Sequence, residues 1–146
     1  MKYHFLIHTD GGSRGNPGPA AFGVVIESAS AGWRKEYGEC IGKATNNVAE
    51  YSAVIFALKK LKSLVGGEKA QNSSVQVHAD SELLVKQLSG EYKIKEENIR
   101  NLFLDAWNLK LDFGEVIFKH IPREENHGAD KLVNQALDAE NSKLDI

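Results

Sequence analysis

Four acidic residues occupy positions from which a folded chain could assemble a reactive site. Asp10 follows a strand-like run, Glu50 lies near the start of a helical pattern, Asp80 follows a short apolar run, and Asp130 lies near the start of the last helical pattern. Carboxylates held within a few ångströms repel one another, so they either acquire raised pKa values or bind cations. An all-oxygen ligand set without cysteine favours Mg²⁺ or Mn²⁺ over zinc.

Such a cluster suits the hydrolysis of phosphodiesters. Two ions roughly 3.5–4 Å apart can activate water on one side of a phosphorus and stabilise the leaving oxygen on the other. Taken singly, Glu50, Asp80 and Asp130 could each serve only to stabilise a nearby helix N-terminus. Asp10 has no helix dipole to account for it, because it ends a strand. The interpretation therefore depends on the four acids together.

The hydrophobic pattern predicts the elements that must bring these acids together. The first three strands are joined by short connections, which favour antiparallel pairing. Asn46 or Asn47 is available as the N-cap of the first helix, and Gly66-Gly67 ends it. The expected strands cover residues 2–9, 20–27, 33–41, 75–79 and 115–121, and the expected helices cover 47–65, 81–89, 96–111 and 126–138.

This order of elements predicts an α/β fold with a mixed sheet that helices cover on both faces. Ligands of such sheets bind beyond the carboxyl ends of the parallel strands, where the four acids would converge. The length of 146 residues suits one domain over residues 1–146, with a polar tail at 140–146 that frays.

Composition limits the partners of the protein. The formal net charge is −2, so no global positive field attracts nucleic acid, although basic residues are in excess in the first half of the chain. The single Cys40 excludes an internal disulfide and a cysteine-based zinc site. Without a signal peptide or an apolar span, the sequence predicts a cytoplasmic protein with no membrane partner.

Four segments of the sequence resemble the type 1 ribonuclease H family. They are IHTDGGSRGNPGPAAFGVVI, TNNVAEYSAVIFAL, VHADSELLVKQL and IPREENHGADKLVNQAL. The resemblance implies a five-stranded mixed sheet in the order 3-2-1-4-5, with strands 1–3 antiparallel. It further implies hydrolysis of the RNA strand of RNA/DNA hybrids, leaving 5′-phosphate and 3′-hydroxyl ends. Separately, we expect a monomer and infer no obligatory protein partner.

The resemblance also assigns roles to the acids, with two Mg²⁺ or Mn²⁺ ions per active site. Asp10 would bridge both ions, and Asp130 would help to hold the ion that activates water. Glu50 and Asp80 would hold the ion that faces the leaving group.

Other residues match family positions that contact the substrate. Gly11 and Gly12 let the backbone approach the RNA closely, although a tight turn would explain them equally well. The substrate-binding positions implied by the resemblance are Gly11, Gly12, Asn16, Thr45, Asn46 and Asn47, with Thr45 in a phosphate pocket for the DNA strand. The Asn and Thr residues could instead be local caps or turn formers.

Two departures from the family pattern bear on function. Residues 91–95 are too short for the basic protrusion with which several members grip the DNA strand, although Lys93 and Lys95 could partly replace it. Some relatives place a mobile His or Glu before the last Asp to assist product release. Here Glu124, Glu125 and His127 compete for that role, and only His127 titrates near neutrality.

Two alternatives stand beside the nuclease interpretation. A non-catalytic module of the same fold would bind nucleic acid or a protein, and its expected mark is the loss of one or more acids. A related nuclease would keep the chemistry and act on another duplex, such as double-stranded DNA.

Overall fold

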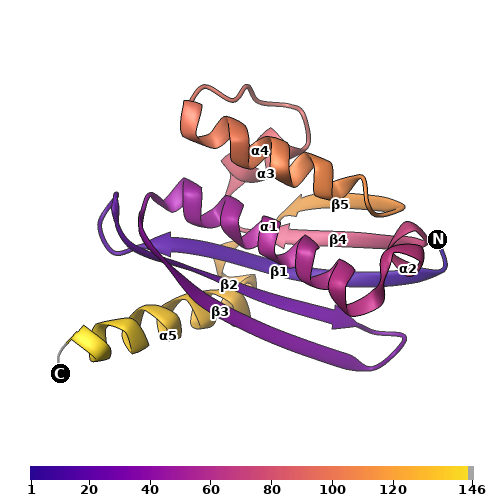
Figure 1. Ribbon diagram of the computed structural model, residues 1–146, viewed down its shortest axis with the longest axis horizontal. Helices are drawn as coiled ribbons and strands as arrows, with labels where there is room; N and C mark the ends of the chain where they lie inside the picture. The colour runs from indigo at the N-terminus through magenta and orange to yellow at the C-terminus, as the bar shows by residue number, and fades with distance from the viewer. Residues whose placement is uncertain (145–146) are drawn as a thin grey trace.

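The computed structural model describes residues 1–144 and is built around a five-stranded mixed sheet (Figure 1). The strand order is β3-β2-β1-β4-β5, which confirms the order expected from the resemblance. β1 pairs with β2 in antiparallel and with β4 in parallel orientation, and β2 pairs with β3 in antiparallel orientation. The strands are β1 (Tyr3–Ser13), β2 (Gly18–Ser28), β3 (Trp33–Ala44), β4 (Ser73–Ala79) and β5 (Glu115–His120).

Helices cover both faces of the sheet, as the sequence predicts. The helical elements are α1 (Asn46–Val65), α2 (Gly67–Gln71), α3 (Glu82–Leu88), α4 (Glu97–Lys110), the 3₁₀ turn η1 (Arg123–Glu125) and α5 (His127–Leu144). In Figure 1, α1, α3 and α4 lie on one side of the sheet and α5 lies on the other. No helix in residues 1–144 is long and apolar enough to cross a membrane.

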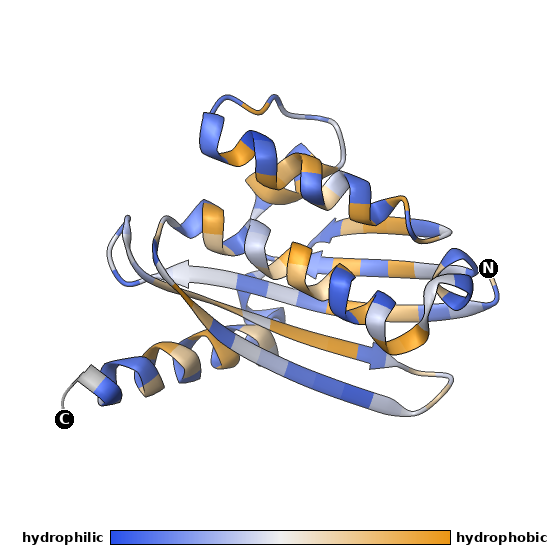
Figure 2. Cartoon of the chain, in the orientation of Figure 1, coloured by the Kyte–Doolittle hydropathy of each residue, from blue (hydrophilic) through white to orange (hydrophobic). Residues whose placement is uncertain are grey.

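The main core lies between α1 and the sheet. Ile7, Val24 and Leu58 are fully buried there, α3 packs on β4 and β5, and α4 packs on α1. A smaller cluster of Ala21 and the α5 residues Val133 and Leu137 fills the opposite face. β2 is therefore buried on both faces and carries an almost continuous apolar run, whereas the edge strand β3 is mostly polar (Figure 2).

Two glycines let the helices approach the carboxyl end of β1. A Cβ atom added at Gly11 would overlap the α1 backbone at Ala49 and Glu50. A Cβ atom at Gly23, the partner of Asp10 on β2, would overlap the α5 backbone at Ala129. Because these positions have no side chains, α1 and α5 pack directly on the sheet and bring their first turns to the same edge.

Several boundaries differ from the sequence-based expectation, among them the end of β3, which continues to Ala44 instead of residue 41. β1 continues to Ser13, so Asp10 lies inside a strand, because residues 11–13 pair with β2. The N-cap of α1 is Thr45, whose hydroxyl accepts from the Val48 N–H at 3.2 Å, and not Asn46 or Asn47.

The last helix is also longer than expected. α5 remains helical to Leu144, so residues 140–144 of the expected frayed tail are ordered as helix, while 145–146 lie outside the described residues. Lys143 and Glu140 form an i,i+3 pair in this last stretch, at 3.8 Å. The sequence did not predict α2 or η1, which are both too short to show a period.

Candidate active site

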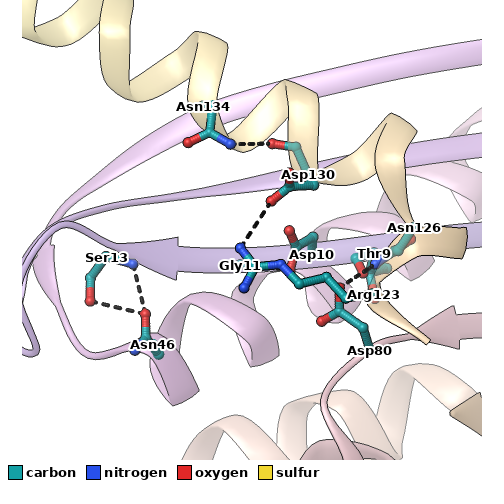
Figure 3. A network of polar contacts seen from close by, with 10 residues as sticks. All are labelled: Thr9, Asp10, Gly11, Ser13, Asn46, Asp80, Arg123, Asn126, Asp130 and Asn134. Carbon is teal, nitrogen blue, oxygen red and sulfur yellow. Dashed lines mark hydrogen bonds and ion pairs between the residues drawn. The ribbon is translucent and has the colours of Figure 1, made fainter. Parts of the chain in front are cut away.

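The four predicted acids line one cavity at the carboxyl end of β1 and β4. Its volume is about 390 Å³. Asp10 comes from β1, Glu50 from α1, Asp80 from the residue after β4, and Asp130 from the first turn of α5. In Figure 3, Asp10, Asp80 and Asp130 lie close together below the first turns of α5. Folding therefore joins carboxylates that are far apart in the sequence.

Burial and mutual repulsion make Asp10 hard to ionise. Burial is the largest cause that raises the pKa of Asp10 to about 8, and the charges of Asp80 and Asp130 raise it further. The Gly11 N–H donates to Asp10 Oδ1 at 3.0 Å, which acts in the opposite direction. At neutral pH the folded chain therefore favours the protonated form of Asp10.

Glu50 shows the same behaviour. Burial raises its pKa to about 7, a hydrogen bond with Ser81 lowers it, and the charge of Asp80 raises it. The Ser81 hydroxyl also accepts from the Leu84 N–H at 3.2 Å as the N-cap of α3. The residue after Asp80 therefore links the start of α3 to a carboxylate of α1.

Asn126 connects the segment before α5 to the residues of the site. This buried side chain donates through Nδ2 to the Thr9 carbonyl at 2.9 Å and to Asp80 Oδ2 at 3.3 Å. A single amide thus connects β1, the end of β4 and the segment before α5 (Figure 3). It positions Asp80 beside Asp10 and sets where α5 begins.

The chemistry of the donors fits hard divalent cations. The cavity combines four carboxylates with two raised pKa values, and bound cations would remove the repulsion that raises them. Among residues 1–144, no three His, Cys, Asp or Glu side chains are already gathered around a common metal position.

Sequence reasoning missed Arg123. Its guanidinium lines the cavity and lies 3.8 Å from Asp130 Oδ1 through Nη2, although the side chain is 82% exposed (Figure 3). The side chain reaches this position because η1 turns the chain between β5 and α5. No sequence period marks a residue in such a short turn, so only the position of Arg123 close before Asp130 could have suggested it.

The three residues that the sequence offers for assisting product release do not line the cavity. Glu124, Glu125 and His127 are exposed and lie outside its wall. His127 is the first residue of α5, on which Asp130 lies within the first turn.

Of the six predicted substrate-binding residues, three line this cavity, one lines a neighbouring cavity, and Asn16 and Thr45 line neither. Gly11, Gly12 and Asn46 line the cavity. Asn46 Oδ1 accepts from the Ser13 N–H at 2.8 Å and from the Ser13 hydroxyl at 3.1 Å, and Asn16 Oδ1 accepts from the Asn46 N–H at 3.0 Å. The β1–β2 connection and the start of α1 are thereby tied together at the rim.

Asn47 lies in a neighbouring cavity of about 600 Å³, beside α3 and the segment that follows it. Tyr92, Lys93 and Lys95 also line that cavity. The Oδ1 atom of Asn47 is buried and has no hydrogen-bond partner within the described part of the chain. This is the region in which the sequence lacks a basic protrusion.

The chain is similar to known proteins over most of its length. Residues 8–136 match the family described as reverse transcriptase-like. The bifunctional protein Rv2228c of Mycobacterium tuberculosis is 41% identical over 135 residues, which make up 92% of this chain and 35% of that protein. Ribonuclease HI of Halobacterium salinarum is 40% identical over 129 residues, which make up 88% of this chain and 62% of that protein. The chain thus spans about a third of the length of the mycobacterial relative.

Solved structures are similar over nearly the whole chain. The N-terminal RNase H domain of Rv2228c superposes with a TM-score of 0.87 at 38% identity, covering 98% of this chain and 99% of that one. LC11-RNase H1 in complex with an RNA/DNA hybrid superposes with a TM-score of 0.85 at 44% identity, covering 93% and 98%.

Proposed function

Because the chain belongs to the type 1 ribonuclease H family, we propose that it cleaves the RNA strand of RNA/DNA hybrids by a two-metal-ion mechanism. The products would carry 5′-phosphate and 3′-hydroxyl ends. The observation that carries this proposal is the meeting of Asp10, Glu50, Asp80 and Asp130 in one cavity, with raised pKa values at Asp10 and Glu50. The bound hybrid of the LC11 relative supports the choice of substrate.

By its match to the family motif, Asp10 would help to hold both Mg²⁺ or Mn²⁺ ions, and the charges of Asp80 and Asp130, which both raise its pKa, support this role. Asp130 would hold one ion, and Glu50 with Asp80 would hold the other. Bound there, the ions would supply an activated water and stabilise the charge on the leaving oxygen. The chain itself contributes the positioning: Asn126 orients Asp80, and the Gly11 N–H orients Asp10.

The rim of the cavity would contact the RNA strand. A Cβ atom added at Gly12 would meet only Val133 Cγ1, at 3.7 Å, so the backbone at Gly12 remains open to a ligand. Asn16 and Asn46 use their Oδ1 atoms within the protein, which leaves their Nδ2 groups to donate to 2′-hydroxyl or phosphate oxygens. Contacts of this kind recognise sugar and phosphate, so base sequence would matter little.

Arg123, in place of His127, would act on the phosphate in this site. A guanidinium donates bidentately to phosphate oxygens, and this one already lies at the cavity wall. Its pairing with Asp130 at 3.8 Å is long and exposed, so exchanging it for a phosphate would cost little. We propose that Arg123 holds the scissile phosphate on entry and the cleaved 5′-phosphate as it leaves.

The cavity beside Asn47 would receive the DNA strand. Lys93 and Lys95 supply positive charge, and Lys86 Nζ lies 5.1 Å from the centroid of the Tyr92 ring. Asn47 lines this cavity and would offer its Nδ2 group to the DNA backbone, because its Oδ1 is buried. Thr45 would reach the DNA phosphate while its oxygen caps α1.

Cleavage of a labelled RNA/DNA hybrid in Mg²⁺ or Mn²⁺ tests the proposal. We expect cutting of the RNA strand by the wild-type chain and a loss of at least a thousandfold in Asp10→Asn, of the order found when an essential catalytic group is removed. Asp105→Asn makes the same chemical change at an exposed position on α4 and should remain active. End-group analysis of the products checks the predicted 5′-phosphate.

The same assay separates the alternatives. A chain that binds the hybrid without cutting it would be the non-catalytic module. Equal cleavage of double-stranded DNA at the same salt concentration would indicate a nuclease for another duplex, and salt must be fixed because phosphate contacts depend on it.

A further inference from the structure

Two histidines lie side by side on the sheet face that α1 does not cover. His8 on β1 and His78 on β4 are direct partners in the parallel pairing of these strands. Their neighbours Ile7 and Val77 are buried on the α1 side, so both imidazoles project from the opposite face. The ring centroids are 5.1 Å apart and the planes are inclined by 72°.

This part of the sheet face is open. α5 packs against β2, β3 and β1, and Figure 1 shows that it crosses only the end of the sheet nearer the acids. A cavity of about 500 Å³ lies in the uncovered part, and its wall includes His4, Gln76 and His78 but not His8. His8 and His78 are both half-buried residues whose positions are fixed by their strands.

The surroundings suit a histidine that binds a metal. His78 Nε2 lies 3.1 Å from Gln76 Oε1. In the tautomer with the proton on Nε2, this contact fixes the ring and leaves the lone pair on Nδ1. In metal-binding histidines, the ring nitrogen that does not bind the metal usually donates its N–H to an oxygen acceptor. Two basic residues lie near the pair. Arg34, near His8, forms an ion pair with Glu27. Lys119 is the register partner of His78, and its positive charge opposes the binding of a cation there.

We propose that His8 and His78 together bind one divalent transition-metal ion, of which Zn²⁺ is the representative. Neutral imidazole is a preferred ligand of zinc, nickel and copper ions, whereas the carboxylate cavity prefers harder ions. In residues 1–144 no group of three or more His, Cys, Asp or Glu side chains surrounds a metal position. Water would therefore complete the coordination of a two-imidazole site, and binding would be weaker than at a four-ligand structural zinc site.

The proposal does not depend on nuclease activity, so its test uses binding alone. Zn²⁺ is titrated into the Asp10→Asn chain, in which the carboxylate cavity has lost its central ligand. The imidazole signals of all five histidines are followed by NMR. We expect two of the five, assigned to His8 and His78, to shift together and to saturate at one equivalent.

Substitution identifies the ligands. In the same background, His78→Gln and His8→Gln should each weaken Zn²⁺ binding by at least tenfold in calorimetry. The matched control is His120→Gln, an exposed histidine at the end of β5, which should leave the affinity unchanged. Circular dichroism verifies that each variant is folded, and the NMR titration needs neither histidine substitution.

Either measurement can overturn the proposal. It fails if His8 and His78 do not shift at one equivalent of Zn²⁺. It also fails if His120→Gln weakens binding as much as His78→Gln, because the effect would then reflect general surface binding.

Discussion

Asp10 is a residue whose chemical role opposes the stability of the metal-free protein. Burial and two neighbouring carboxylates raise its pKa to about 8, so at neutral pH the folded state holds a proton that the unfolded chain would release. We expect Asp10→Asn to raise the free energy of unfolding without metal by roughly 1–3 kcal/mol, because the amide keeps the shape and removes the ionisable group. Urea unfolding in the presence of a chelator measures the difference.

Asp105→Asn is the control for this change, since Asp105 is exposed and lies on α4. Its unfolding free energy should stay within about 0.5 kcal/mol of the wild type. A lower free energy of unfolding in Asp10→Asn than in the wild type would contradict this expectation, because it would mean that the Asp10 carboxyl stabilises the fold.

The raised pKa values also fix the sign of the pH dependence. Between the unfolded-state values and about 7 to 8, the folded chain binds more protons at Glu50 and Asp10 than the unfolded chain does. Stability without metal should therefore fall as the pH rises from about 5 to about 8, and it should fall less in Asp10→Asn. Thermal unfolding across this range gives the test. Saturating Mn²⁺ should reverse the trend, because cations favour the ionised carboxylates.

Substitutions of Arg123 and His127 are expected to differ in their effect on hybrid cleavage. If the Arg123 guanidinium contacts the phosphate, Arg123→Ala should lower kcat/KM for hybrid cleavage roughly tenfold, as expected for one lost charge-assisted hydrogen bond of about 1.4 kcal/mol. His127→Ala should stay within about twofold, because His127 lies outside the cavity wall. Steady-state kinetics on one hybrid at fixed salt compares the two, and a larger loss in His127→Ala would reverse the assignment.

The sequence predicted that the four acids would meet at one edge of the sheet, but it gave no sign that Arg123 would lie beside them. Each acid lies at or near the end of a strand or at the start of a helix, and the carboxyl edge of a parallel pair is where such ends meet. Arg123 reaches the site through the conformation of the three-residue η1 and the direction of a long side chain. Neither property leaves a periodic mark in the sequence.

At the scale of elements, the contact between β1 and α1 depends on the absence of one side chain. A Cβ at Gly11 would overlap the backbone of Ala49 and Glu50, and backbone cannot yield as a side-chain tip can. Gly11→Ala should therefore lower the free energy of unfolding by about 2–3 kcal/mol and displace Glu50 from the cavity. Denaturant unfolding and Mn²⁺ affinity measure the two effects.

Gly12→Ala is the matched control, because its Cβ would make only an ordinary contact with Val133. It should change stability by less than about 0.5 kcal/mol, so any rise in its KM for the hybrid would report the proposed RNA contact at Gly12. Equal destabilisation by both substitutions would contradict the packing account of Gly11.

A hydrophobic period in the sequence predicts where an element begins and ends. It does not predict a boundary that is determined by strand pairing or by helix capping. The period of α1 and the apolar run of β4 locate both elements to within two residues. The extension of β1 through Gly11 and Gly12 arises from pairing with Phe22 and Ala21, which the residues of β1 alone do not reveal. Three adjacent candidates at 45–47 could cap α1, and only the backbone conformation selects Thr45.

At the scale of the whole molecule, charge sets how firmly a hybrid can be held. The formal net charge of −2 provides no long-range attraction, so affinity must come from local groups such as Lys93, Lys95 and Arg123. Glu91 and Glu96 line the same cavity as the two lysines and oppose them. We therefore expect modest hybrid affinity that decreases with salt in proportion to the few phosphate contacts made.

Reversing one of these charges tests whether that cavity meets the DNA backbone. Glu91→Lys should lower the Kd for a hybrid several-fold at low salt and steepen the slope of log affinity against log salt by up to roughly 0.9, the value for one added phosphate contact. Glu68→Lys changes the net charge equally, on α2, which lies at the opposite end of the sheet from the acids in Figure 1. Binding is measured with Asp10→Asn in Ca²⁺-free, Mg²⁺-free buffer to prevent cleavage. If the two lysine variants bind alike, the gain comes from net charge alone and the DNA strand does not contact this cavity.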